Sequence, residues 1–499
     1  MVLNNTHSMN RESSDVTGVG KIKQMSQWQE LTWLGLILIA GLSLRLLFIR
    51  FFPTIPFSDF LSLLDFAIIF RDDWLAKNAW QWRYFSPGLP LILSVILRFV
   101  HESPETVGRW TTALVTGLVP VLPYLFWKDI FSARTRIIAA ALLALWPSQI
   151  LFSSILAQDN WIIFPTVAIS VLAVRVLVTK KEGYTPIVAA LLYALTSAIR
   201  QEMMIVLFPA TITAILAGER RNRLRNLLVG SLIISTIFIA LILQRGLATG
   251  FYTFRTEHFG KAILGAYVPG AGMGWIDPIP YVKTTYPELI KNGDPDSKLA
   301  QEGLRITWHE FVRRPRFHVI RIFGSTLTNL FEMDEQLVWW SLGEGMLPPR
   351  YQNNVSMLTK NLLPLLKFYP VMVNMLFACS LFFVLSHRLL LKWITPILAT
   401  IALKIGLHAV IVSQSRYYLV VIALEILVIS VVWDSMLKKE NWRLSLRSVI
   451  LGIVSILLLI VSMNYAKEYI KTHDIVLHSY YELSNYPDQI VSSQSGLRE

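Results

Sequence analysis

Residues 226–244, NLLVGSLIISTIFIALILQ, contain no charged side chain over nineteen consecutive positions. As an α-helix this stretch would be about 28 Å long, close to the roughly 30 Å hydrocarbon core of a bilayer. The seven residues before it, 219–225, include four arginines. An apolar run of this length with a basic cluster at one end is typical of a transmembrane helix.

The composition of the whole chain agrees with this interpretation. Hydrophobic residues make up 54% of the 499 residues and charged residues 16%, whereas a soluble domain carries roughly 25% charged residues. A largely disordered chain is excluded because such chains are poor in apolar residues, and a disulfide scaffold is excluded because there is one cysteine. We predict an all-α polytopic membrane protein, because lipid requires internally satisfied backbone hydrogen bonds. Eleven spans are expected, at 31–49, 110–127, 137–158, 160–179, 183–199, 203–218, 226–244, 368–387, 393–415, 417–433 and 448–466.

Charge in the short loops sets the orientation. Five loops on one side of the predicted bundle hold fifteen basic and five acidic residues: 128–136, 180–185, 219–225, 388–392 and 434–447. Because short cytoplasmic loops are rich in Lys and Arg, this side is predicted to be cytoplasmic, with the N-terminus inside and the C-terminus outside. The runs 87–100 and 319–331 are too short to cross, and we expect in-plane or re-entrant segments there.

The predicted organisation is unequal on the two faces. It comprises a cytoplasmic, disordered arm (1–30), a transmembrane module (31–245) with an outer loop (51–109), a second outer loop (246–367), C-terminal transmembrane helices (368–466) and an outer tail (467–499). The net charge of +13 is assigned to the inner loops and anionic lipid, not to nucleic acid. Large outer loops without internal repeats favour an outer-face enzyme over a transporter.

Two acids stand at predicted outer ends of spans. Asp59 follows the first span after a Pro-rich exit, and Asp159 ends the third span. A carboxylate at such a depth is costly unless it is hydrated, paired or functional. Each is also compatible with an ordinary acid at a loop end.

Basic side chains share this face. Arg416 begins the tenth span beside Tyr417, Arg109 opens the second, and Arg200 with Glu202 forms the hairpin between spans five and six. A guanidinium at the headgroup level can bind a phosphate through two hydrogen bonds. The alternative is an interfacial arginine whose charge extends to the water. No nucleotide-binding motif accompanies these residues, and the Gly-rich stretch 270–274 lacks the strand of a phosphate loop.

Lys404 and Glu425 differ because both lie inside predicted spans. Each stands about ten residues from the hairpin between those spans, which corresponds to a similar depth of about 15 Å. We predict an intramembrane ion pair between them, with a structural role favoured over a relay.

The order and sidedness of these features resemble the C-type membrane glycosyltransferases that use polyprenyl-phosphate sugars, including the protein O-mannosyltransferases and the lipid A aminoarabinose transferases. The resemblance covers 31–245 well, 393–433 loosely and 246–367 hardly at all. Two positions depart from the family: Phe60, where many relatives carry an acid or a polar residue, and Gln201, where they usually carry proline. The matching features are Asp59, YFSPGLP at 84–90, Arg109, WKDIFSAR at 127–134, Asp159, AIRQE at 198–202 and RYY at 416–418.

The resemblance implies a helical core with an outward-facing cavity, a polyprenyl-phosphate sugar as donor, and a glycan, lipid or protein as acceptor. Asp59 would be the base of an inverting transfer, and Asp159 would orient the acceptor or share a divalent metal ion with Asp59. Arg416, with Arg109 or Arg200, would stabilise the leaving phosphate. No nucleotide cofactor is implied, and the expected location is the plasma membrane of a prokaryote.

Two other functions stay open. A membrane glycan ligase or polymerase would use a diphosphate-linked donor and also needs outer-face arginines. A lipid-linked sugar transporter would form no glycosidic bond and would not need Asp59 as a base.

Overall fold

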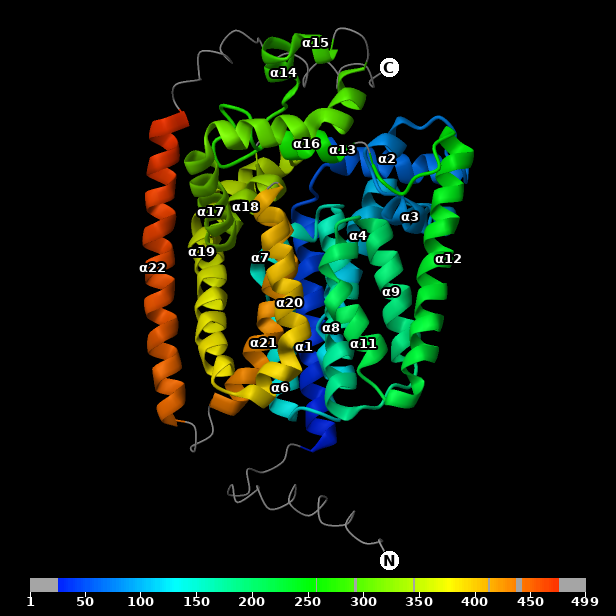
Figure 1. Ribbon diagram of the computed structural model, residues 1–499. Helices are drawn as coiled ribbons and strands as arrows, with labels where there is room; N and C mark the ends of the chain where they lie inside the picture. Colours follow the sequence, from blue (N-terminus) through cyan, green and yellow to red (C-terminus); the bar gives the residue numbers. More distant parts are fainter. Residues whose placement is uncertain are drawn as a thin grey trace, which may run out of the picture.

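The structure is a computed structural model that describes residues 26–474, except 257, 291–293, 344–345, 412 and 437–441. The described part is helical throughout and contains no β-strand (Figure 1). Most of the predicted N-terminal arm and of the outer tail lies outside the described residues.

Seven apolar helices in the described part are long enough to cross a membrane, which confirms the polytopic all-α class. The first, α1, begins with a capping box in which Ser26 and Gln29 exchange hydrogen bonds with each other's backbone N–H. These helices are α1 (Gln27–Phe51), α8 (Gln158–Thr179), α12 (Arg223–Thr249), the second half of α19 (Pro349–Leu385), α20 (Arg388–Val410), α21 (Leu419–Met436) and α22 (Trp442–Asp474).

The remaining expected spans are shorter or interrupted. Prolines stand at the start of the second piece in each interrupted span, at Pro120, Pro147 and Pro209. Proline lacks a backbone N–H and its ring clashes with the preceding turn, so a straight helix cannot continue through these positions. The pieces are α4 (Pro104–Gly117) with α5 (Val121–Phe126), α6 (Ala133–Ala144) with α7 (Pro147–Phe152), α9 (Thr185–Ile199), and α10 (Met203–Val206) with α11 (Phe208–Leu216).

One end of the bundle carries a second layer of helices from the two outer loops, with α13 and α16 lying across it (Figure 1). The α11–α12 and α19–α20 turns lie at the opposite end, where α1 begins. The short run at 87–100 forms one of these outer helices, and the run at 319–331 belongs to another. The layer contains α2 (Ser58–Asp72), the 3₁₀ turn η1 (Trp80–Arg83), α3 (Gly88–Phe99), α13 (His258–Leu264), α14 (Ile279–Thr285), α15 (Pro287–Ile290), α16 (Pro295–Arg313), α17 (Pro315–Phe331) and α18 (Met333–Leu342).

Burial separates central from peripheral helices. Residues of α21 are almost all buried, whereas α12 and α22 bury few of their side chains and stand at opposite edges of the bundle (Figure 1). Apolar side chains such as Leu232 and Leu458 are exposed there, as expected for helices that face lipid. The outer end of α22 is tied to the Gly-rich stretch, because the Asp474 carboxylate accepts hydrogen bonds from the backbone N–H groups of Gly270 (3.2 Å) and Gly272 (2.9 Å).

Candidate active site

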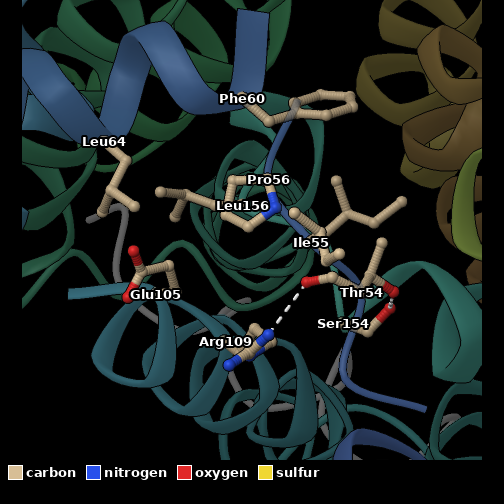
Figure 2. A pocket seen from close by; sticks show the side chains of 10 residues that line it. Thr54, Ile55, Pro56, Phe60, Leu64, Glu105, Arg109, Ser154 and Leu156 are labelled. Carbon is tan, nitrogen blue, oxygen red and sulfur yellow. Dashed lines mark hydrogen bonds between the residues drawn. The ribbon is translucent and has the colours of Figure 1, made fainter. Parts of the chain in front are cut away.

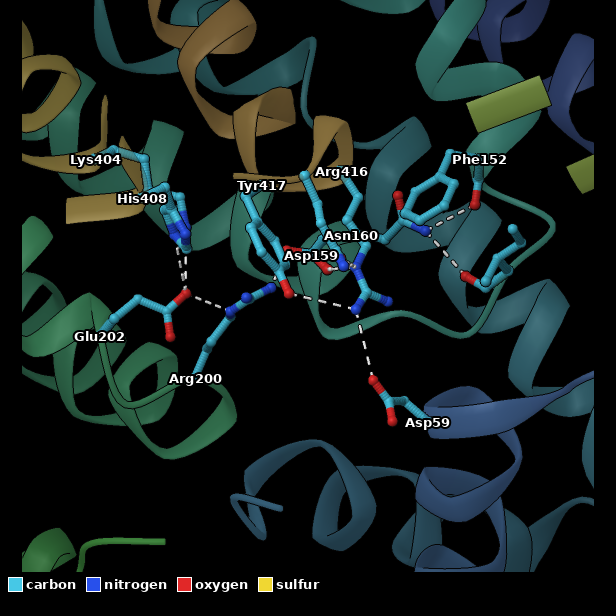
Figure 3. A network of polar contacts seen from close by, with 12 residues as sticks. Asp59, Phe152, Asp159, Asn160, Arg200, Glu202, Lys404, His408, Arg416 and Tyr417 are labelled. Atoms are coloured by element: carbon cyan, nitrogen blue, oxygen red, sulfur yellow. Dashed lines mark hydrogen bonds and ion pairs between the residues drawn. The ribbon is translucent and has the colours of Figure 1, made fainter. Parts of the chain in front are cut away.

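Segments far apart in the sequence meet at the end of the bundle that carries the outer helices (Figure 3). Asp59 lies in the first turn of α2 and Asp159 in the first turn of α8. Arg200 follows α9, Glu202 precedes α10, and Arg416 lies in the 3₁₀ turn η3 (Ser415–Tyr418). The structure therefore brings together most of the residues that the sequence singled out.

A turn between α7 and α8 presents Asp159. The Asn160 side-chain N–H₂ donates to the carbonyls of Phe152 (2.8 Å) and Ile155 (2.9 Å), and its oxygen accepts from Gln149 (3.5 Å). These bonds satisfy backbone carbonyls of a turn that is buried in the bundle. Asp159 itself is buried, and its carboxylate faces the two arginines.

Arg200 is held on both edges by carboxylates. Its Nη1 pairs with Asp159 and its Nε with Glu202, while its planar face lies 4.3 Å from the ring centroid of Tyr417. The backbone of Arg200 is extended where α9 ends, which directs the side chain into the site. The neighbouring Gln201 ties this turn to the second outer loop through hydrogen bonds with Phe254 and Thr256.

Glu202 also contacts two side chains of the transmembrane helix α20. Its Oε1 lies 3.3 Å from Lys404 Nζ and 3.5 Å from His408 Nε2, and both partners come from α20 (Figure 3). The predicted Lys404–Glu425 pair is therefore wrong. Glu425 is buried in α21, and its Oε2 has no hydrogen-bond partner within the described residues. Equal depth on neighbouring helices does not make two side chains face each other, because the rotation of each helix about its axis decides that.

Arg416 is surrounded mainly by aromatic rings. Its Cζ lies 5.3 Å from the centroid of Phe60, 5.0 Å from Trp340 and 5.2 Å from Tyr417. Its carboxylate contacts are longer than good charged hydrogen bonds, at 3.5 Å to Asp59 and 3.8 Å to Asp159. Nε donates to Gln414 Oε1 at 3.0 Å.

Asp59 is the accessible acid of the group. Its side chain is 55% exposed, whereas those of Asp159 and Glu202 are 4% and 19% exposed. The preceding residue, Ser58, has φ of 49°, a left-handed conformation that is uncommon outside glycine. Such local strain is found at sites where the side chain that follows must be aimed in a particular direction.

Arg109 makes different contacts from these residues. Its Nη1 donates to the backbone carbonyl of Thr54 at 2.9 Å and its Nη2 to the Thr106 hydroxyl at 3.5 Å. It lines a narrow cleft together with Phe60 and Leu156 (Figure 2). Arg109 and Arg416 both neighbour Phe60, and a shared phosphate site stays a prediction.

The charges of the site balance. Three carboxylates, Asp59, Asp159 and Glu202, accompany three cations, Lys404, Arg200 and Arg416. Asp59 and Asp159 are the acids that would hold a divalent metal ion, and both face arginines in this arrangement: Asp159 faces Arg200 and Arg416, and Asp59 faces Arg416. A metal shared by the two acids stays a prediction. No group of three or more His, Cys, Asp or Glu side chains suited to a metal ion occurs among the described residues.

Sequence reasoning missed several participants. His408 stands one helical turn after Lys404 and could have been found from that spacing. Asn160 is adjacent to Asp159, but its role as a turn anchor depends on carbonyls of the preceding turn. Trp340 comes from the second outer loop, and no local pattern indicates its contact with Arg416.

Comparisons with known proteins agree with the class that the motifs indicated. Residues 85–244, about a third of the chain, match the family model described as dolichyl-phosphate-mannose-protein mannosyltransferase. No curated protein matches the chain.

A solved structure similar to this chain is the archaeal oligosaccharyltransferase AglB from Archaeoglobus fulgidus, in complex with an inhibitory peptide and a dolichol-phosphate. It is 15% identical with a TM-score of 0.44, and the similarity covers 89% of this chain and 55% of AglB. This chain thus spans about half the length of that enzyme.

Asp159, Arg200 and Glu202 lie within the residues that match the family model, whereas Asp59 and Arg416 lie outside them. It supports a C-type membrane glycosyltransferase, which is the class that the order of motifs predicted.

Proposed function

We propose that this protein transfers a monosaccharide from a polyprenyl-phosphate donor to a hydroxyl or amine of an acceptor, with inversion at the anomeric carbon. The observation that carries the proposal is the pairing of an accessible carboxylate, Asp59, with the guanidinium of Arg416, 3.5 Å away. Three aromatic rings surround that guanidinium. An inverting transfer needs a base for the acceptor and a cation for the leaving phosphate.

Arg416 is the better phosphate ligand of the two arginines. The two edges of Arg200 are already occupied by Asp159 and Glu202. Arg416 is bound through its faces by aromatic rings. Among the described residues its hydrogen bonds come from Nε and Nη2, to Gln414 and Tyr417, and not from Nη1. Cation–π contacts hold a guanidinium without consuming its N–H groups, so these remain able to donate to phosphate oxygens.

Asp59 is the better base because it is exposed and has one long ion-pair contact. In the resting site that contact is with Arg416. An in-line displacement places the base and the leaving phosphate on opposite sides of the sugar ring, so the resting contact must open. Donor phosphate would take over the N–H groups of Arg416 and leave Asp59 free to receive a proton.

The step then balances as follows. The acceptor loses its proton to the Asp59 carboxylate while its oxygen or nitrogen forms a bond to the anomeric carbon. The bond between that carbon and the phosphate oxygen breaks, and its electron pair leaves with the polyprenyl phosphate. Arg416 stabilises the added negative charge on phosphate. Asp159 lies between Arg200 and Arg416 and lowers the repulsion between the two cations.

The same charges favour a monophosphate carrier over a diphosphate. A diphosphate-linked donor brings a second phosphate group, and the second arginine of the site is already neutralised by two carboxylates. A transporter would have no use for a base, whereas the exposed carboxylate of Asp59 beside Arg416 supports a transfer reaction.

The test is product analysis with purified protein in nanodiscs. The protein receives a panel of polyprenyl-phosphate monosaccharides together with a total envelope extract, and mass spectrometry detects new glycoconjugates and released polyprenyl phosphate. Wild type should produce both in equal amounts. Asp59→Asn should lower turnover at least about a hundredfold, whereas Asp72→Asn, an exposed acid at the other end of α2, should retain it.

Release of polyprenyl phosphate without a conjugate, or retained turnover in Asp59→Asn, would overturn this mechanism. No turnover of any monophosphate donor by folded wild type, followed by turnover of a diphosphate-linked donor, would establish the ligase alternative.

A further inference from the structure

The second outer loop contributes an aromatic side chain directly to the site. Trp340, from α18, stacks on Phe57 with a centroid distance of 5.3 Å and an interplanar angle of 18°. It also meets the edge of Phe60 at 5.4 Å, and its ring centroid lies 5.0 Å from Arg416 Cζ. This part of the chain lies outside the family match.

Aromatic rings form part of the immediate surroundings of Arg416, beside its hydrogen bond to Gln414 and its long ion pairs. Phe60 and Trp340 belong to different segments, α2 and α18, and both contact the guanidinium. The carboxylates of Asp59 and Asp159 lie 3.5 Å and 3.8 Å from the nearest guanidinium nitrogen of Arg416. An arginine whose ion pairs are this long would move toward a closer pair with Asp59 if an aromatic wall were removed.

The position of α18 is itself fixed against the segment that leads to Asp59. The Ile55 N–H donates to the carbonyl of Met346 at 2.8 Å, just after α18. The Thr54 hydroxyl donates to the carbonyl of Ser341 at 3.2 Å, and the Ser341 hydroxyl donates to Leu151 at the end of α7 at 3.4 Å. Trp340 therefore stands at a defined place relative to both Asp59 and Arg416.

We propose that Trp340 is a positioning residue of the transfer site. It holds the guanidinium of Arg416 away from Asp59, so that the arginine presents N–H groups to the donor phosphate and the carboxylate stays available as a base. This inference rests on the proposed function, because it assigns Trp340 a role through the phosphate ligand named there. It also makes α18 a wall of the site, in addition to any role of the second outer loop in choosing the acceptor.

The experiment is a double-mutant cycle between Trp340 and Arg416, read as lipid binding and as turnover. Trp340→Leu, Trp340→Phe, Arg416→Gln and the double variant Trp340→Leu/Arg416→Gln are prepared in nanodiscs. Polyprenyl phosphate is titrated and its dissociation constant is measured by native mass spectrometry. Trp308→Leu, at an exposed aromatic on α16, is the matched control.

Trp340→Leu should weaken polyprenyl-phosphate binding about tenfold, within the range expected for a desolvated cation–π contact. Trp340→Phe should stay within about threefold of wild type, and Trp308→Leu should be unchanged. In the Arg416→Gln background, Trp340→Leu should cause no further loss, because the group through which it acts is gone.

Equal and additive losses in both backgrounds would overturn the proposal, as would unchanged binding in Trp340→Leu. If Trp340→Leu does not yield folded protein, Phe57→Leu, which removes the ring stacked on Trp340, tests the same contact. A folded wild type that binds no polyprenyl phosphate would refute the proposed function as well. A wild type that binds and turns over normally beside an unaffected Trp340→Leu would refute the role of Trp340 alone.

Discussion

Replacement of Glu202 by glutamine tests the central polar network most directly. Lys404 is fully buried, and Glu202 is the carboxylate with which it pairs in the structure, at 3.3 Å. Glu202→Gln keeps the shape of the side chain but leaves a buried ammonium without its counter-charge. Removal of one partner of a buried ion pair typically costs about 3–5 kcal/mol. We expect the lower end of this range, because the Glu202 side chain is partly exposed.

The pairing also predicts which second change restores stability. Lys404→Met alone should cost about 1 kcal/mol, because Glu202 remains paired with Arg200. Combined with Glu202→Gln, it removes the orphaned charge, so the double variant should be more stable than Glu202→Gln by itself. Glu425→Gln is the matched control. It makes the same substitution at another buried glutamate, whose Oε2 has no hydrogen-bond partner among the described residues, and it should change stability little.

The assay is thermal unfolding of the purified variants in one detergent, together with the yield of monodisperse protein. An unchanged midpoint in Glu202→Gln would refute the reasoning. So would a failure of Lys404→Met to restore stability in the double variant. A loss in Glu425→Gln as large as that in Glu202→Gln would instead favour a Lys404–Glu425 pair in the membrane.

Three further predictions concern the arginines and the orientation. Arg416→Lys should lower turnover about tenfold or more, because a lysine lacks the planar guanidinium that binds phosphate through two hydrogen bonds. Steady-state kinetics with saturating acceptor check this, and near-normal rates would exclude Arg416 as the phosphate ligand. Arg109→Gln should leave polyprenyl-phosphate affinity within about threefold of wild type in a lipid titration, because the Arg109 guanidinium is engaged with the Thr54 carbonyl. A larger loss would support its predicted share in the phosphate site. In a Cys379→Ala background, a single cysteine is introduced at the exposed position of Arg221 or of Thr284 and treated with an impermeant maleimide. The cysteine at 221 should react only from the cytoplasmic side and the cysteine at 284 only from the outside. The reverse labelling would contradict the predicted orientation.

The membrane-crossing helices followed from local sequence because apolarity over about twenty residues is sufficient to place a segment in lipid. The stretch 226–244 is a single helix in the structure, within α12. Interruptions at Pro120, Pro147 and Pro209 were also visible in the sequence, yet runs such as 110–127 were expected as single spans. Each of these prolines removes a helical hydrogen bond, so the run around it divides into two helices.

The candidate site was partly predictable because sidedness follows from counting spans. Asp59, Asp159, Arg200 and Arg416 all stand at helix ends on one side, and in the structure they lie together. The direction of the Arg109 side chain was not predictable in the same way: it donates to the Thr54 carbonyl and lines a narrow cleft with Phe60. Depth along a helix can be counted from sequence, whereas the direction in which a side chain points depends on its neighbours.

By itself, the sequence determined the membrane class, the positions of the apolar helices and the collection of charged side chains at one end. These properties depend on hydropathy and on residue counts, which are local. Only the tertiary structure decided the partners: Glu202 for Lys404, two carboxylates for Arg200, and the ring of Trp340 for Arg416. Apart from the Arg200–Glu202 pair, these contacts join residues between 41 and 202 positions apart, and the packing and rotation of whole helices decide them.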